Sequence, residues 1–345
     1  MISALHQGVR IVLKTEQRIT NNPQETAFRP AWWLPGAHLQ TLGGRVLRHT
    51  VQIFYERMTL QTPDDDFLAI DVADGLGTLE RNKKGCVLLL HGLEGCSRSG
   101  YILTMVNALR SEGFACAVLN FRSCSGSPNR QPRFYHSGET QDLHFVVRNL
   151  TQRTGQPLSG IVGFSLGGNV LLKYLGENHG EQPLHRAAAV SVPFDLSAGA
   201  DYLTKGLSRY YEIYFLLQLK RKIRLKEETY NHGIDLKPMN QIKTLREFDE
   251  VYTAPIHGFD SAEDYYTRSS SRRYIDSVTT PTLILNSKDD PIIPPRSIPT
   301  ERITNNKFIT AHITERGGHV GFIEGPHPLS VRYWAEKTVT QFLTD

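Results

Sequence analysis

Residues 163–167 read Gly-Phe-Ser-Leu-Gly, and this spacing of glycines around Ser165 is typical of a nucleophilic serine in a tight turn. The pattern predicts a strand over Leu158 to Val162 before the turn and a helix over Ser165 to Gly176 after it. Glycines tolerate strained backbone angles and carry no Cβ atoms that would collide, so such a turn lifts the hydroxyl clear of the sheet. The chemistry indicated is attack of the Ser165 hydroxyl on an acyl carbon. The alternative is an ordinary glycine-rich turn.

A general base for that attack is available at His319, which is bracketed by Gly317, Gly318 and Gly321. It follows a predicted strand, Phe308 to Ile313, and the flanking glycines let a loop carry the imidazole over the serine. The chain has 13 histidines, and the alternative for any one of them is a purely structural role.

The third group of such a triad is a carboxylate that fixes the imidazole tautomer and stabilises the imidazolium. Asp289 and Asp290 both follow the predicted strand Thr282 to Asn286, and a proline-rich loop comes next. The residues alone leave both aspartates open. Either one gives the order serine, aspartate, histidine along the chain, which is the order found in α/β hydrolases.

Two backbone N–H groups are candidates for stabilising the oxyanion that this attack would form. Residues 91–95 read His-Gly-Leu-Glu-Gly directly after the apolar run Cys86 to Leu90, and a loop in this place supplies one donor. We expect the N–H groups of Leu93 and Leu166 to face the same carbonyl oxygen. The alternative is that His91 and its neighbouring glycines only shape a turn. The chemistry needs no metal and no organic cofactor.

These segments belong to a longer alternation of strands and helices, which predicts the α/β-hydrolase fold, a mostly parallel central sheet flanked by helices. Two earlier strands are predicted over Val51 to Tyr55 and Phe67 to Val72, separated by a turn at residues 62–66. The other predicted strands are Phe114 to Leu119 and Arg186 to Val192, and the other helices are Tyr101 to Arg110, Gly138 to Arg153 and Leu329 to Leu343.

Residues 194–275 contain no clear buried strand and predict a mainly helical cap inserted into one core, residues 31–193 and 276–345. Residues 1–30 read as an N-terminal arm. Within the insertion, Tyr211 to Leu225 is apolar and aromatic at first and then basic. Such a helix could grip an acyl chain or rest weakly on an anionic membrane surface. The alternative is a cap helix that buries its apolar stripe and points its lysines at water.

Composition narrows the class of protein. Hydrophobic residues make up 39% and charged residues 21% of the 345 residues, which indicates a packed core rather than disorder. The formal charge of +4 is small and no basic run is interleaved with aromatics, so no nucleic-acid partner is expected.

The four cysteines form no C-x-x-C pair and no metal-spaced set, which indicates free thiols in a reducing cytoplasm. No run approaches the ~20 apolar residues of a membrane span, and no signal peptide is recognised.

Several segments together resemble the YheT-like α/β hydrolases, a branch that also contains abhydrolase-domain lipid hydrolases and medium-chain ester synthases. The resemblance runs from about Trp32 to the C-terminus. Ala37 and Ser123 depart from it, because the branch usually has glycine at both positions. Besides the motifs of Ser165 and His319 and the segment 91–95, it rests on residues 33–41 (Trp-Leu-Pro-Gly-Ala-His-Leu-Gln-Thr), 120–126 (Asn-Phe-Arg-Ser-Cys-Ser-Gly) and 135–140 (Tyr-His-Ser-Gly-Glu-Thr).

The resemblance implies that Asp290 is the triad acid, because the branch places the acid directly before an x-x-x-Pro segment, here residues 291–294. It also implies esterase or acyltransferase action on medium-chain acyl esters or lipids. Arg122 and His136 lie in the shared segments and either line the pocket or brace loops. Cys96 and Cys124 lie near the predicted site in sequence and are expected to serve packing only.

The leading hypothesis is a serine hydrolase that cleaves carboxylic esters of medium-chain acyl groups or lipids through an acyl-enzyme. An acyltransferase (ester synthase) that passes the acyl group to an alcohol would use the same residues. A third hypothesis is a non-catalytic binding protein on a hydrolase scaffold. The expected partner is a small-molecule acyl ester or lipid.

Overall fold

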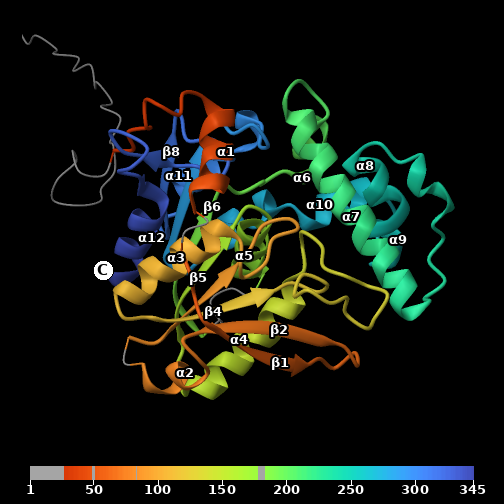
Figure 1. The fold of residues 1–345 in the computed structure, drawn as a ribbon, viewed down its shortest axis with the longest axis horizontal. Helices are drawn as coiled ribbons and strands as arrows, with labels where there is room; N and C mark the ends of the chain where they lie inside the picture. The colour runs from red at the N-terminus through yellow and green to blue at the C-terminus, as the bar shows by residue number, and fades with distance from the viewer. Residues whose placement is uncertain (1–26, 49–50, 83, 178–182) are drawn as a thin grey trace, which may run out of the picture.

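An eight-stranded sheet forms the centre of the computed structural model, which describes residues 27–345 except 49–50, 83 and 178–182 (Figure 1). The order of strands across the sheet is β1-β2-β4-β3-β5-β6-β7-β8. Most of the predicted arm, residues 1–26, lies outside the described residues. The strands of the sheet are β1 (Tyr55–Gln61), β2 (Phe67–Ala73), β3 (Cys86–Leu90), β4 (Ala115–Asn120), β5 (Leu158–Phe164), β6 (Leu184–Val190), β7 (Thr282–Ser287) and β8 (Ile309–Thr314).

The sheet is mostly parallel, as predicted: the six strands from β4 to β8 run the same way, and β2 pairs antiparallel with both β1 and β4. The predicted strand over Val51 to Tyr55 is wrong, because β1 begins at Tyr55. The turn at residues 62–66 fixes this register, since Gln61 pairs with Phe67 and the Thr62 N–H donates to the Asp66 carbonyl at 3.0 Å. Being an edge strand, β1 is only partly buried and carries no continuous apolar run.

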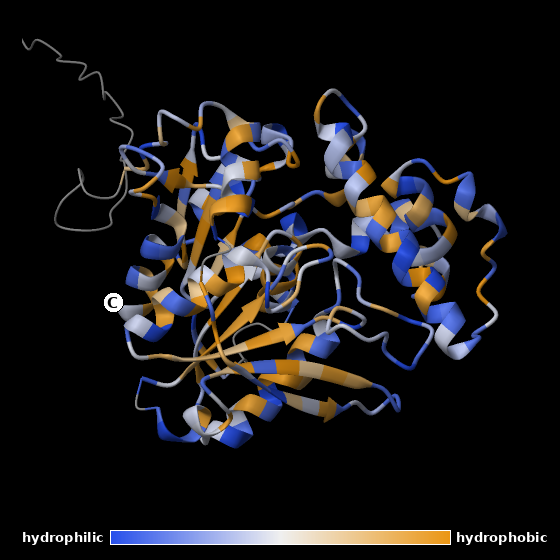
Figure 2. Cartoon of the chain, in the orientation of Figure 1, coloured by the Kyte–Doolittle hydropathy of each residue, from blue (hydrophilic) through white to orange (hydrophobic). Residues whose placement is uncertain are grey.

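Helices cover both faces of the sheet, and Figure 2 shows the strands as mainly hydrophobic between them. Side chains alternate along each strand. In β3, Val87 and Leu89 face the cluster formed with α3 and α12, whereas Leu88 and Leu90 face the cluster that includes α4 and α5. The helices are α1 (Ala37–Leu47), α2 (Gly77–Arg81), α3 (Gly100–Ser111), α4 (Thr140–Thr154), α5 (Leu166–Glu177), α6 (Leu196–Leu203), α7 (Ser208–Tyr230), α8 (Leu245–Phe248), α9 (Ala254–Ile256), α10 (Ala262–Ser269), α11 (Thr300–Asn305) and α12 (Trp334–Thr344).

The connection from β6 to β7 is helical and carries α6 to α10, which lie at one side of the sheet layers in Figure 1. Its longest helix, α7, buries Leu216, Leu219 and Ile223. Two of its basic side chains, Lys222 and Lys226, are also turned inward. The idea that the helix points its lysines at water is therefore wrong for these two. No helix in the described part of the chain combines the length and apolarity needed to cross a membrane.

The two ends of the described chain meet on the α12 side. Phe28 packs against Phe322 and Trp334, with ring centroids 5.6 and 5.4 Å apart. The closing helix begins at Trp334 and not at the predicted Leu329, because the preceding residues form β10 (Arg332–Tyr333), which pairs with β9 (Ile323–Glu324).

Candidate active site

Ser165 occupies the turn between β5 and α5 with a φ of 52°, in the left-handed region that a non-glycine residue seldom adopts. The turn is held by the Ser165 N–H, which donates to the Val190 carbonyl at 2.8 Å. Glycine is required on both sides: a Cβ at Gly163 would lie 2.5 Å from the Gly167 oxygen, and one at Gly167 would lie 2.6 Å from the Leu90 oxygen. The local sequence thus folds into the strained turn that its glycines predicted.

His319 brings two predicted residues together. Its Nε2 lies 2.9 Å from Ser165 Oγ, and its Nδ1 lies 2.7 Å from Asp290 Oδ2. Asp290 is fully buried, and the side chain of His319 is 9% exposed. With Nδ1–H donated to the carboxylate, Nε2 is left as an acceptor for the serine proton. The arrangement can therefore transfer a proton from Ser165 to His319.

The two candidate aspartates, Asp289 and Asp290, have different hydrogen-bond partners. Asp290 contacts His319, whereas Asp289 accepts the Gly318 N–H at 2.9 Å through Oδ1. The His319 loop is fixed further by Thr41, whose hydroxyl accepts the His319 N–H at 2.9 Å, and by Ser191, whose hydroxyl accepts the next N–H along the chain at 2.9 Å. By holding the backbone of the loop, these contacts fix the position from which the His319 side chain extends.

The loop 91–95 approaches the serine closely, since a Cβ at Gly92 would lie 3.1 Å from Ser165 Cβ. Within the described chain, no hydrogen bond engages the backbone N–H of Leu93 or of Leu166, and both residues line a cavity with Ser165. Burial lowers the pKa of His91 to about 3, so its imidazole is neutral. Its Nδ1 bonds to the Gly92 carbonyl and its Nε2 accepts the Phe121 N–H. The His91 side chain therefore shapes the turn and does not reach the serine.

Two cavities meet at Ser165. The smaller, of about 110 Å³, is mainly apolar and runs between the core and the helices of the insertion. The larger, of about 560 Å³, lies between α1, α7 and the loop 91–95. The smaller is lined by Leu93, Leu196, Ala200, Leu203, Phe215 and Leu219 among others, and the larger by His38, Leu42, Arg45, Tyr101, Tyr211 and His319 among others.

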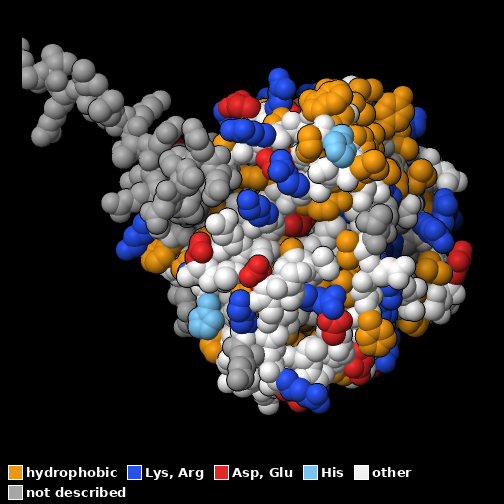
Figure 3. Space-filling model, turned by 60° about the vertical axis from the view of Figure 1, so that its left-hand side comes forward, with side chains coloured by type: hydrophobic (Ala, Val, Ile, Leu, Met, Phe, Trp, Pro, Cys, Tyr) orange, Lys and Arg blue, Asp and Glu red, His pale blue; other side chains and the backbone are white. Residues whose placement is uncertain are grey.

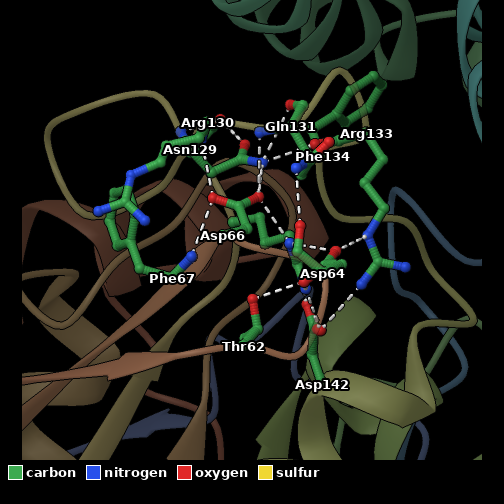
Figure 4. Close-up of polar contacts among 12 residues, drawn as sticks. Thr62, Asp64, Asp66, Phe67, Asn129, Arg130, Gln131, Arg133, Phe134 and Asp142 are labelled. Carbon is green, nitrogen blue, oxygen red and sulfur yellow. Dashed lines mark hydrogen bonds and ion pairs between the residues drawn. The ribbon is translucent and has the colours of Figure 1, made fainter.

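The remaining residues singled out in the sequence divide between the cavity and its supports. Arg122 is buried and braces loops, because its guanidinium lies 2.6 Å from Asp66 and 2.7 Å from Asp142. Figure 4 shows these two carboxylates within their network of polar contacts. His136 lines the smaller cavity. Burial raises the pKa of the Cys124 thiol to about 12, which keeps it protonated and unsuited to nucleophilic attack.

Sequence reasoning missed several supporting residues. The Tyr101 hydroxyl accepts the Gly92 N–H at 2.9 Å, and the Tyr135 hydroxyl accepts the Glu94 N–H at 2.8 Å. Thr41 and Tyr135 lie in the segments 33–41 and 135–140, which carried the family resemblance. The resemblance therefore drew attention to the two segments, but it did not predict which contacts Thr41 and Tyr135 make.

Comparison with known proteins gives one consistent family. Residues 85–326 match the family model described as "alpha/beta hydrolase fold". The chain is 37% identical over 327 residues to "Putative esterase YheT" of Escherichia coli (strain K12), covering 92% of this chain and 93% of that protein. It is 31% identical over 321 residues to "Phospholipase ABHD3" of Mus musculus, covering 92% and 78% of the two chains.

The solved structure of the Pyrococcus furiosus esterase Pf2001 has the same fold. The match has a TM-score of 0.54 at 18% identity and covers 85% of this chain and 92% of that one. At this identity the likeness concerns the fold alone.

Proposed function

Since the chain belongs to the α/β-hydrolase family, we propose that it cleaves carboxylic esters of medium-chain acyl groups or lipids through an acyl-enzyme on Ser165. One observation carries the proposal: His319 lies between the Ser165 hydroxyl and the buried carboxylate of Asp290, at 2.9 and 2.7 Å. A protein that used this fold only for binding would not require a serine, a histidine and a buried carboxylate in hydrogen-bonding contact, because binding involves no proton transfer from the serine.

In the first half of the reaction, Ser165 Oγ bonds to the acyl carbon while His319 Nε2 takes the hydroxyl proton. Asp290 stabilises the resulting imidazolium. The negative oxygen is held by the N–H groups of Leu93 and Leu166. When the carbon–oxygen bond to the alcohol breaks, His319 returns the proton to the leaving oxygen, and the acyl group remains on Ser165.

In the second half, a water molecule gives a proton to His319 and attacks the acyl carbon. The bond to Ser165 Oγ then breaks, His319 protonates that oxygen, and the carboxylic acid leaves. Each proton that His319 accepts is returned within the same half-reaction, so the enzyme ends in its starting state.

The two cavities support the substrate class. The smaller, apolar cavity suits an acyl chain, because transfer of apolar surface from water into it is favourable. The larger cavity carries Arg45, His38 and tyrosine hydroxyls, which suits the more polar leaving group. The name of the mouse relative, a phospholipase, supports a lipid ester among the substrates.

We also propose weak contact with a membrane surface. Exposed apolar side chains stand at the rim of the larger cavity: Leu42 is 49%, Leu207 60% and Tyr210 72% exposed. Figure 3 shows a face of the molecule on which hydrophobic side chains gather. Sedimentation with anionic vesicles tests this contact, and a protein that stays in the supernatant would contradict it. A cytoplasmic location remains our expectation, supported by four free cysteines.

The direct test is hydrolysis of p-nitrophenyl esters from acetyl to palmitoyl by the wild type and by Ser165→Ala. We expect a maximum at medium chain length in the wild type and loss of hydrolysis in the variant. Hydrolysis retained by Ser165→Ala, or equal rates at every chain length, would contradict the proposal. Product analysis with added ethanol separates hydrolysis from acyl transfer.

A further inference from the structure

The residue after Leu93, Glu94, is held in an unusual conformation. Its φ is 54°, in the left-handed region where non-glycine residues are uncommon. One hydroxyl secures both of its ends: Tyr135 Oη accepts the Glu94 N–H at 2.8 Å and donates to Glu94 Oε1 at 2.7 Å. The Leu93 N–H lies one peptide before the Glu94 N–H, so these contacts hold the loop directly on the C-terminal side of the Leu93 donor.

The same carboxylate is joined to the helical insertion. Lys222, in the middle of α7, places Nζ 2.6 Å from Glu94 Oε1, and the two side chains are 9% and 8% exposed. The ammonium lies 4.4 Å from the centre of the Tyr135 ring and donates to Cys124 Sγ at 3.1 Å. Burial acts to lower the pKa of Lys222, but the neighbouring Glu94 carboxylate opposes this effect, and the pKa lies above its ordinary value.

A buried ion pair of this kind is costly to break from one side. Removing one partner leaves the other as an uncompensated buried charge, whereas replacing both by neutral groups is often close to neutral. Without the ammonium of Lys222, the Glu94 carboxylate is more stable in water than buried and unpaired. Turning outward would also let the Glu94 backbone leave its strained left-handed conformation.

We propose that Lys222 is a positioning residue, which acts through Glu94 to keep the Leu93 N–H directed at the oxyanion. The inference rests on the proposed function, in which Leu93 supplies one of the two donors. It makes the catalytic loop of the core dependent on α7 of the insertion. Loss of a whole oxyanion donor typically costs about 10²- to 10³-fold in rate, so a displaced donor should cost about 10-fold or more.

Lys226 provides a matched control one turn further along α7. It is also a buried lysine, but its Nζ donates to the carbonyls of Asn129 and Gln131, in the network of Figure 4, and not to the loop 91–95. Lys222→Met and Lys226→Met therefore make the same substitution at two inward-facing positions of the same helix. A general loss of packing in the insertion should affect both variants alike.

The experiment compares kcat and KM for p-nitrophenyl octanoate in the wild type, Lys222→Met, Lys226→Met and Lys222→Met/Glu94→Gln. We expect kcat to fall about 10-fold or more in Lys222→Met with KM within twofold, kcat within about twofold of wild type in Lys226→Met, and partial recovery in the double variant. Equal losses in both lysine variants, or an unchanged kcat in Lys222→Met, would overturn the inference.

Hydrogen exchange of the peptide covering residues 91–95 gives a reading that needs no activity. Faster exchange in Lys222→Met than in Lys226→Met is expected, because a Glu94 side chain that turns to water would draw the Glu94 N–H away from Tyr135 Oη, its acceptor. Equal exchange would overturn the inference. If the wild type hydrolyses no ester, the proposed function fails, and the exchange result still decides whether Lys222 holds the loop.

Discussion

Asp290 offers His319 a single carboxylate oxygen. Oδ2 lies 2.7 Å from His319 Nδ1, while Oδ1 accepts the N–H groups of Ile292 and Ile293 at 2.8 and 3.1 Å. The backbone therefore fixes which oxygen faces the imidazole. Because both oxygens are used as acceptors, the site is built for an ionised carboxylate.

This geometry predicts a severe defect in Asp290→Asn. The amide oxygen must accept the two backbone N–H groups, so the amide NH₂ is turned toward His319 Nδ1. His319 Nδ1 then has to accept a hydrogen bond from the amide, so the proton of the neutral imidazole moves to Nε2. With Nε2 protonated, the imidazole can no longer take the proton of Ser165. We expect kcat to fall by about 10⁴-fold with an unchanged melting temperature, as judged by steady-state kinetics and circular dichroism.

Asp289→Asn is the control for this prediction. Its amide oxygen can still accept the Gly318 N–H that Asp289 Oδ1 accepts at 2.9 Å. We expect the loss of kcat to stay below about 10-fold. Comparable losses in the two variants would show that the assignment of Asp290 as the acid is wrong.

The positions of Ser165 and His319 could be predicted because each follows a predicted strand and lies in a short glycine-containing motif with demanding backbone geometry. For the acid, the predicted strand left Asp289 and Asp290 open, and the family resemblance implied Asp290. Parallel strands end at one edge of the sheet, so these motifs converge there. The supports could not be predicted in the same way. Thr41 contacts the backbone of His319 across 278 positions of the chain, and such a contact leaves no local period in the sequence.

The lysines of α7 illustrate a second limit. Helical periodicity places charged residues on the solvent side by default, and Lys222 and Lys226 depart from it. Their charges are met by Glu94 and by backbone carbonyls, which belong to distant loops. Only the tertiary structure reveals such partners.

A second prediction concerns the serine turn. In Gly167→Ala the added Cβ would meet the carbonyl oxygens of Leu90 and His91 at 2.6 and 2.7 Å, and backbone atoms cannot move aside as a flexible side chain can. We expect a loss of about 3 kcal/mol in the free energy of unfolding, measured by urea denaturation.

Gly199→Ala is the contrasting variant, because nothing lies within 4 Å of its Cβ in α6. It should be neutral or stabilise by up to about 1 kcal/mol. Similar destabilisation by both would argue against the close packing of the turn.

A third prediction is a pH-dependent stability difference at Asp249. Burial raises its pKa from 3.8 to about 6, although the Tyr266 hydroxyl donates to it at 2.7 Å. The folded protein thus binds this proton more tightly than the unfolded chain. The penalty for the ionised carboxyl is absent below about pH 4, grows as the pH rises, and is complete above about pH 6.

Asp249→Asn removes the penalty and keeps an acceptor for Tyr266. We expect it to be more stable than the wild type at pH 8, by up to about 3 kcal/mol, with the difference vanishing near pH 4. Melting curves of both proteins across this range provide the measurement. A difference that does not change with pH would be inconsistent with this account.

A fourth prediction concerns the apolar cavity. Ala200 of α6 is 8% exposed and lines the cavity of about 110 Å³. Ala200→Phe should fill part of this space and move the preferred p-nitrophenyl ester to a shorter acyl chain. Ala198→Phe, on the same helix but outside the cavity lining, should leave the preference unchanged. An unaltered preference in Ala200→Phe would show that the acyl chain lies elsewhere.

The central claim is that Ser165 is the nucleophile activated by His319. Its most direct measurement is labelling with an alkyl fluorophosphonate, followed by mass spectrometry of the peptides. We predict one adduct on Ser165, no adduct in Ser165→Ala, and labelling slowed by 10²-fold or more in His319→Ala, on the order expected when a base is lost. An adduct on another residue, or equal labelling of Ser165→Ala and the wild type, would contradict the claim.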